Sequence, residues 1–262
     1  MVNRQHDDWE ELATLDPYWA ILSDPLKRFG GWNEEEFFRT GAREIDEVIS
    51  AASELGHPLE FNKALDFGSG LGRLTRSLSS RFQECVGIDI AESMIDRARE
   101  INANWPNCRF VLNARSDLQD FPSNEFDFVY CNIVLQHLPS KALIRTYITE
   151  FIRVMKPGGL VIFQVLSFLP LKYRLQPTRR VYRLLRSVGF SASFVYRRLG
   201  LCPIRNNYIP RPEVLDHICS VGGDPLRSTE KNIEGLGIRS CTYYVTKKVD
   251  EGIKYRQKDS SP

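Results

Sequence analysis

One stretch constrains the fold of this chain more than any other: residues 64–74, which read Ala-Leu-Asp-Phe-Gly-Ser-Gly-Leu-Gly-Arg-Leu. An apolar run leads into Gly68, Gly70 and Gly72, and a helical pattern follows. This order predicts a buried strand, a glycine turn and the start of a helix. Glycine lets a backbone approach a ligand where any Cβ would clash. The stretch therefore predicts a ligand site at the end of a strand.

A second apolar run, residues 85–89, ends in an acid, Asp89. A carboxylate at the end of the neighbouring strand can accept hydrogen bonds from both hydroxyls of a ribose. The glycine turn and Asp89 together predict a pocket for a cofactor that contains a nucleoside. The same acid at a strand end is also compatible with a simple helix cap.

Strands and helices alternate from residue 63 onward, which indicates a parallel sheet covered on both faces and wound with right-handed crossovers. We expect strands near 63–67, 85–89, 108–113, 126–132, 159–166, 225–230 and 241–246, and helices near 71–82, 92–103, 140–155 and from Pro212 to about Val221. Ligands bind at the carboxyl ends of such strands.

The N-terminal part contains several aromatic residues, and we expect residues 1–32 to be irregular. Asn33 then caps a long helix that ends before Gly56 and Pro58. We divide the chain into four parts on this basis. They are an N-terminal helical cover (1–58), a cofactor-binding domain (59–167 and 209–248), a basic helical lid insertion (168–208) and a flexible tail (249–262).

The insertion carries an amphipathic helix and lies in a stretch, between Glu150 and Glu213, that contains no Asp or Glu. Its apolar face holds Val181, Leu184, Leu185 and Val188, and its basic face holds Arg179, Arg183 and Arg186. A solvated face is one interpretation. A second is a substrate site in which Arg179 and Arg183 hold an anionic acceptor. A third, less favoured, is a helix lying on anionic lipid.

Composition restricts the class of protein. The net charge of +2 over 262 residues is too small to indicate a nucleic-acid partner. The polar start of the chain lacks the apolar core of a signal peptide. The six cysteines form no C-x-x-C pair, and the four histidines show no metal-ligand spacing. We therefore expect reduced cysteines, no metal and a cytoplasmic location.

Four segments in this order and spacing resemble the class I S-adenosylmethionine-dependent methyltransferases, in their small-molecule methyltransferase-domain group. Residues 65–72 and 87–94 look like the first two motifs of the family. Residues 126–138 look like its fourth strand and the loop after it, and residues 153–159 like the turn into its fifth strand. The resemblance implies an α/β fold: a doubly wound, Rossmann-like, mostly parallel sheet of seven strands with an antiparallel last strand, plus a helical insertion.

The resemblance also implies S-adenosyl-L-methionine as the cofactor. Gly68 and Gly70, with Ser69 and Gly72 in the same loop, would pass under its methionine part and ribose. Asp66 would orient its ammonium through backbone and water, or would only cap the turn. The remaining contacts would come from Asp89 (ribose hydroxyls), Ile90 and Met94 (adenine), and Asn132 and Ile133 (methionine end).

One position departs from the family pattern. Family members often carry an acid after the third strand that receives the adenine amino group, and here Ala114 takes its place. Asn113 or Asp117 would have to substitute for it.

The resemblance implies methyl transfer, to oxygen, on a small or medium metabolite. His137 is the only histidine expected at the catalytic edge, where it is a base or a structural residue. Gln136 beside it binds either the acceptor or backbone. One alternative is a non-catalytic protein that binds the cofactor as a scaffold or regulator. A nicotinamide-dependent oxidoreductase is less favoured, because the glycines run G-x-G-x-G. The acceptor, the oligomeric state and the pathway stay open.

Overall fold

A computed structural model of the chain describes residues 2–247, and side chains from residue 5 onward. The flexible tail expected at 249–262 lies outside the described residues. No helix within the described part combines the length and the apolar character needed to cross a membrane.

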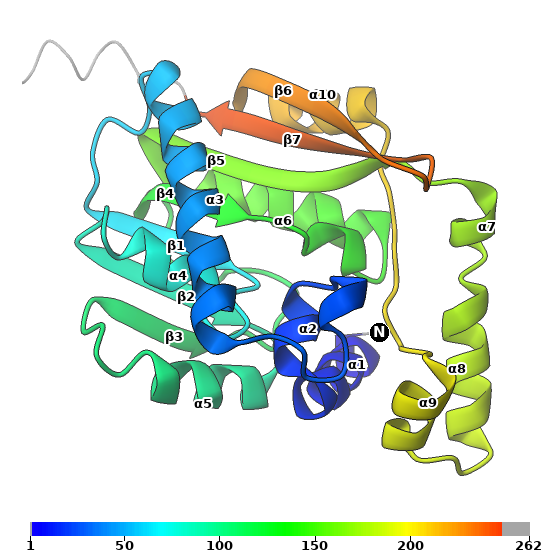
Figure 1. Cartoon of the computed structure of the whole chain (residues 1–262). Helices are drawn as coiled ribbons and strands as arrows, with labels where there is room; N and C mark the ends of the chain where they lie inside the picture. Colours follow the sequence, from blue (N-terminus) through cyan, green and yellow to red (C-terminus); the bar gives the residue numbers. More distant parts are fainter. Residues whose placement is uncertain (1, 248–262) are drawn as a thin grey trace, which may run out of the picture.

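A sheet of seven strands in the order β3-β2-β1-β4-β5-β7-β6 forms the centre of the molecule (Figure 1). The first five strands are parallel, and β7 runs antiparallel to both β5 and β6. The predicted fold class is therefore confirmed. The strands are β1 (Lys63–Phe67), β2 (Glu84–Asp89), β3 (Cys108–Leu112), β4 (Phe126–Cys131), β5 (Met155–Phe168), β6 (Asp224–Ile233) and β7 (Ile238–Thr246).

Helices cover both faces of the sheet. On one face lie α3 (Glu34–Glu54) and α4 (Arg73–Leu78), and on the other α6 (Lys141–Val154) and α10 (Arg211–Ser220). The helix α5 (Glu92–Ile101) packs against β3. As the sequence predicts, Asn33 caps α3, because its side chain accepts a hydrogen bond from the Glu36 N–H at 3.2 Å.

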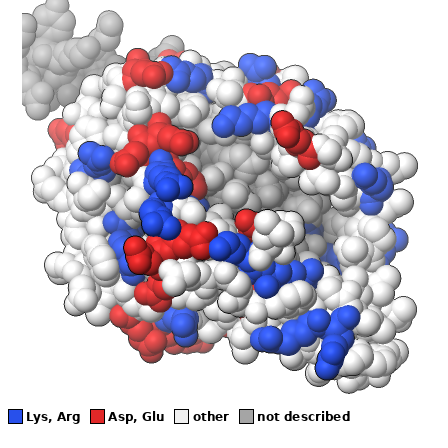
Figure 2. Space-filling view, in the orientation of Figure 1, with Lys and Arg blue, Asp and Glu red and all other residues white. Residues whose placement is uncertain are grey.

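The inserted segment forms three helices beside the N-terminal ones: α7 (Leu171–Arg174), α8 (Pro177–Ser187) and α9 (Ala192–Leu199) (Figure 1). Acidic and basic side chains are mixed over most of the face in Figure 2, but basic ones gather without acidic ones at the lower right, around α8 and α9. This distribution follows from the absence of Asp and Glu between residues 150 and 213.

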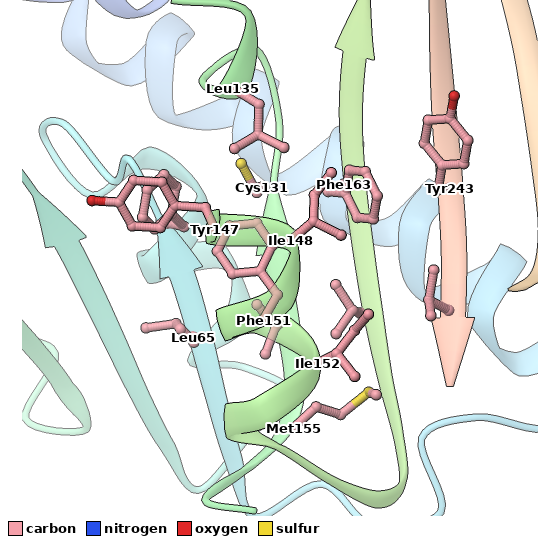
Figure 3. Close-up of a cluster of buried hydrophobic side chains, with 14 of the residues drawn as sticks. Leu65, Cys131, Leu135, Tyr147, Ile148, Phe151, Ile152, Met155, Phe163 and Tyr243 are labelled. Atoms are coloured by element: carbon pink, nitrogen blue, oxygen red, sulfur yellow. The ribbon is translucent and has the colours of Figure 1, made fainter. Parts of the chain in front are cut away.

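The largest core cluster lies between α6 and the sheet (Figure 3). Tyr147 and Phe151 of α6 pack against Phe67 at the end of β1, with ring centroids 4.6 and 5.0 Å away. Phe163 of β5 stacks on Tyr243 of β7 at 5.0 Å. Each such side chain contributes about 1.5–3 kcal/mol when fully buried. This packing fixes the carboxyl end of β1, from which the glycine turn departs.

Three expectations need correction. Residues 2–32 are not irregular: they form α1 (Val2–Leu15), α2 (Pro17–Ile21) and a short 3-10 helix, η1 (Pro25–Lys27). α4 spans only 73–78, because Gly72 at φ +83° sets its start and the chain leaves the helix at Ser79. β5 begins at Met155 rather than near 159, because Met155 pairs with Phe126 ahead of a bulge.

Candidate cofactor and acceptor site

A cavity lies at the carboxyl ends of the parallel strands, where the sequence predicts the ligand site. Ten residues named from the sequence line it: Gly68, Ser69, Gly70, Asp89, Ile90, Met94, Asn113, Asn132, Ile133 and His137. Residues not anticipated join them, notably Gln5 and Trp9 of α1, Ala20 and Ile21 of α2, and Arg73 of α4. Asp66, Gly72, Ala114, Gln136, Arg179 and Arg183 are not among its lining residues.

The glycine turn adopts a left-handed backbone conformation that glycine accommodates and other residues rarely do. Gly68 and Gly70 have φ of +78° and +50°, in the left-handed region that favours glycine. A Cβ at Gly68 would collide with Val134, and one at Gly70 would collide with Ile21. Ser69 between them is 3% exposed, and its Oγ has no hydrogen-bond partner among the described residues. An unpaired buried hydroxyl is costly, so a polar ligand fits this turn.

Asp89 connects β2 to the glycine turn. Its Oδ2 accepts a hydrogen bond from the Gly70 N–H at 2.9 Å, and its Oδ1 accepts one from the Ala91 N–H at 3.0 Å. Burial raises the pKa of this carboxyl, and the backbone hydrogen bonds oppose that shift. Each oxygen keeps a further lone pair, so the carboxylate retains the capacity to accept from a diol.

Asp66 lies beneath the turn rather than at the cavity. It is 1% exposed and accepts a hydrogen bond from the Thr75 hydroxyl at 2.6 Å. Burial raises the pKa of Asp66 to about 7, and the Thr75 hydrogen bond opposes the shift. The structure thus shows Asp66 tying β1 to α4, and any effect on a ligand passes through the backbone above it.

Arg73, which sequence reasoning missed, is a buried cation at the cavity. It is 3% exposed, and its guanidinium donates to Glu44 Oε2 at 2.8 Å. Its Nε has no partner among the described residues. The other oxygen of Glu44 accepts from Tyr130 at 2.9 Å and from the Asn132 amide at 2.7 Å. The sequence did contain a signal for this role, because Arg73 directly follows the glycine turn and lies between Leu71 and Leu74, two apolar residues that are buried.

His137 ends the short 3-10 helix η2 (Leu135–His137). Its Nδ1 lies 2.6 Å from the carbonyl oxygen of Arg205. A carbonyl only accepts, so Nδ1 carries the proton and Nε2 of the neutral ring carries a lone pair. Burial lowers the pKa of His137, which favours this neutral form. The ring can therefore act as a base, and the Trp9 ring packs on it edge-on at 5.5 Å.

Gln136 and Asn113 lie at different places: Gln136 lines a second cleft, and Asn113 lines the main cavity. The Gln136 amide nitrogen lies 3.4 Å from His137 Nε2, and Gln136 lines a second cleft between α3 and strands β4, β5 and β7. Asn113 lines the main cavity, but its side chain also closes its own loop, donating to the Asp117 carbonyl at 3.1 Å and accepting from the Arg115 N–H at 3.2 Å.

The N-terminal helices lie directly beside the cavity. Glu10 of α1 accepts hydrogen bonds from the backbone N–H of Ser93, at 3.1 Å, and from its hydroxyl, at the start of α5. Trp9, the residue before Glu10, lines the cavity. Helix α1 therefore forms the wall of the cavity next to α5.

The two arginines named as substrate ligands already have a partner. Arg179 and Arg183 donate to the same oxygen of Asp8 in α1, at 2.9 and 3.0 Å. Arg179 also donates to the Pro203 carbonyl at 2.8 Å. Neither lines the cavity, so among the described residues both arginines contact α1 and the loop at Pro203 rather than the cavity.

Comparisons with known proteins identify this architecture. Residues 65–163 match the family model described as "Methyltransferase domain". "Phosphoethanolamine N-methyltransferase 3" of Arabidopsis thaliana is 27% identical over 112 residues, which are 42% of this chain and 23% of that protein. "Ubiquinone biosynthesis O-methyltransferase" of Methylococcus capsulatus is 33% identical over 106 residues, 40% of this chain and 44% of that protein. The chain thus spans less than half of the length of either relative.

Among solved structures, the fold is similar to that of magnesium protoporphyrin IX methyltransferase from Synechocystis, solved with bound SAH. The TM-score is 0.60 at 19% identity, over 94% of this chain and 99% of the other. The domain match, the sheet order and the glycine turn facing Asp89 lead to one conclusion: residues 65–163 form a methyltransferase domain of the class I S-adenosylmethionine-dependent type.

Proposed function

We propose that this chain transfers the methyl group of S-adenosylmethionine to an oxygen atom of a small or medium metabolite. One observation carries the proposal: the glycine turn, Asp89 and a neutral His137 line the same cavity. The family match removes the nicotinamide-dependent oxidoreductase from the alternatives.

The residues at the cavity fit the cofactor. Asp89 would accept from the ribose hydroxyls, and the Ser69 hydroxyl would gain the partner that it lacks. Ile90 and Met94 would flank the adenine. Arg73 lines the cavity, and its Nε, which has no partner among the described residues, would bind the carboxylate of the methionine part. When bound, the cofactor supplies an activated methyl group on a positively charged sulfur.

The protein's part in the transfer is positioning and proton removal. Alignment of the reacting groups and exclusion of water can supply up to about 7–11 kcal/mol of barrier reduction in favourable cases. Trp9 and Ile21 line the cavity, and their apolar side chains would exclude water from this part of it. His137 would take the proton of an acceptor hydroxyl at Nε2, while the Arg205 carbonyl holds Nδ1–H and stabilises the charged ring. Such a base contributes about 10²–10⁴-fold.

The acceptor class is open to a direct test with a panel of hydroxyl, carboxylate and amine compounds and S-adenosylmethionine carrying a labelled methyl group. The names of the relatives include both an N- and an O-methyltransferase, so the panel needs both kinds of acceptor. We expect label transfer to a hydroxyl compound. Cofactor binding without transfer to any acceptor would favour the non-catalytic scaffold instead.

His137→Gln tests the base. With the hydroxyl acceptor we expect kcat to fall about 10²–10⁴-fold, with the dissociation constant of the cofactor unchanged. His57→Gln is the matched control, because the Nδ1 of His57 also lies near a backbone carbonyl, that of Gly158 at 3.0 Å, but outside the cavity. Near-normal turnover of His137→Gln would show that His137 is structural.

A further inference from the structure

The amphipathic helix α8 is oriented opposite to an ordinary surface helix. Its basic face points inward, where Arg179 is 8% exposed and pairs with Asp8 of α1. Its apolar face points outward, with Val181, Leu184 and Val188 exposed by 46, 63 and 64%. A surface helix normally buries its apolar stripe against the core. This outward face therefore calls for a contact that the described residues do not provide.

Exposed apolar side chains continue along the chain on either side of α8. Leu171 and Leu175, at α7, are 67 and 50% exposed. Phe190, just before α9, and Phe194, in its first turn, are each 43% exposed and stack on one another at 5.6 Å. We call Leu175, Val181, Leu184, Val188, Phe190 and Phe194 the outer apolar face. Clustering of this kind, rather than scattered single residues, marks an interaction surface.

The charges around this face have one sign. Lys172, Arg180, Arg197 and Arg198 are exposed, and none forms an ion pair within the described part of the chain. The segment from 151 to 212 contains no acidic residue that could balance them. Figure 2 shows the same excess of basic side chains over the region of α8 and α9.

We infer that the outer apolar face docks on an anionic lipid surface, with α8 lying in the plane of the interface. Apolar side chains flanked by Lys and Arg are the combination that binds the boundary between headgroups and acyl chains. A symmetric contact with a second copy is less compatible, because it would bring unpaired cations together without acidic partners. The contact would be peripheral, since no described helix could span a bilayer. The inference goes beyond methyl transfer and does not depend on it.

The experiment is co-sedimentation of the full chain with vesicles of phosphatidylcholine, alone or mixed in equal parts with phosphatidylglycerol. We expect partition into the mixed vesicles only, and weaker partition at high salt. Leu184→Gln should lower the partition coefficient about ten-fold or more. Leu59→Gln, at a residue 65% exposed in the loop before β1, is the matched control and should change little.

A second pair of variants tests the charge. Arg180→Gln and Arg197→Gln should each lower partition into the mixed vesicles roughly five-fold, whereas the exposed Arg39→Gln and Arg43→Gln of α3 should not. Failure of the wild type to bind mixed vesicles, or equal losses in variants and controls, would overturn the inference. So would self-association that Leu184→Gln abolishes, because the face would then belong to a second copy. Cofactor binding by each variant confirms its fold and keeps this result separate from the proposed activity.

Discussion

Asp66 is a buried carboxyl beneath the glycine turn, and its burial makes the stability of the protein depend on pH. Burial raises its pKa to about 7, far above that of a carboxyl in an unfolded chain. The folded state therefore holds the proton more tightly, and the stability that Asp66 contributes is greatest at low pH. That contribution is lost as the pH rises from about 4 through about 7.

We predict that Asp66→Asn flattens this part of the pH dependence. The free energy of unfolding of the wild type should fall between pH 5 and pH 7 with a slope of up to about 1.4 kcal/mol per pH unit from this group. Urea unfolding at a series of pH values measures the slope. Asp46→Asn, at an exposed acid on α3, should keep the slope of the wild type. An Asp66→Asn protein with an unchanged slope would contradict the shifted pKa.

At the level of elements, α1 joins the insertion to the cofactor domain. Asp8 and Glu11 pair with Arg179, Arg183 and Arg186 of α8, while Glu10 binds the start of α5. These pairs are partly buried, and Arg179 has only 10% of its side chain exposed. Removing a carboxylate from such a pair leaves a buried cation without its partner.

We predict that Asp8→Ala destabilises the contact between α1 and α8 by about 1–3 kcal/mol. Amide hydrogen exchange should become faster in α1 and α8, and binding of the cofactor should weaken, because Gln5 and Trp9 of α1 line the cavity. The neighbouring Asp7→Ala is the matched control, since Asp7 is 75% exposed and its ion pair among the described residues is with the adjacent His6. Equal exchange rates in the two variants would show that the ion pairs at Asp8 do not hold α1 in place.

The same elements show what the sequence could and could not predict. The strands were predictable, because β4 and β5 are buried on both faces and read as continuous apolar runs. Helix α3 was predictable from its cap and apolar face. Helix α1 was not, because it carries few apolar residues and is stabilised by partners elsewhere. Its Asp8 pairs with Arg179, 171 positions later, which no local pattern reveals. The inward orientation of the basic face of α8 was not predictable for the same reason, because it depends on the pairs that Arg179 and Arg183 form with Asp8.

At the scale of the whole molecule, the sheet order decides which residues meet. β1 lies between β2 and β4, so the glycine turn, Asp89 and the loop after β4 converge at one edge. That convergence was predictable from motif order. The sequence predicts an N-terminal cover over residues 1–58. It does not predict which residues of α1 and α2 line the cavity, or that Arg73 does, because these contacts depend on packing between distant segments. The domain division and the individual roles of the site residues stay predictions.

The central claim is that this cavity binds S-adenosylmethionine through the glycine turn and Asp89. The most direct measurement is calorimetric titration of the purified chain with S-adenosylmethionine, with S-adenosylhomocysteine and with NADH as the control ligand. We predict saturable binding of the two adenosyl ligands and none of NADH. Asp89→Ala should abolish the binding, and Asp96→Ala, at an exposed acid on α5, should retain it. A folded wild-type protein that binds neither adenosyl ligand, or that binds them equally well without Asp89, would contradict the account.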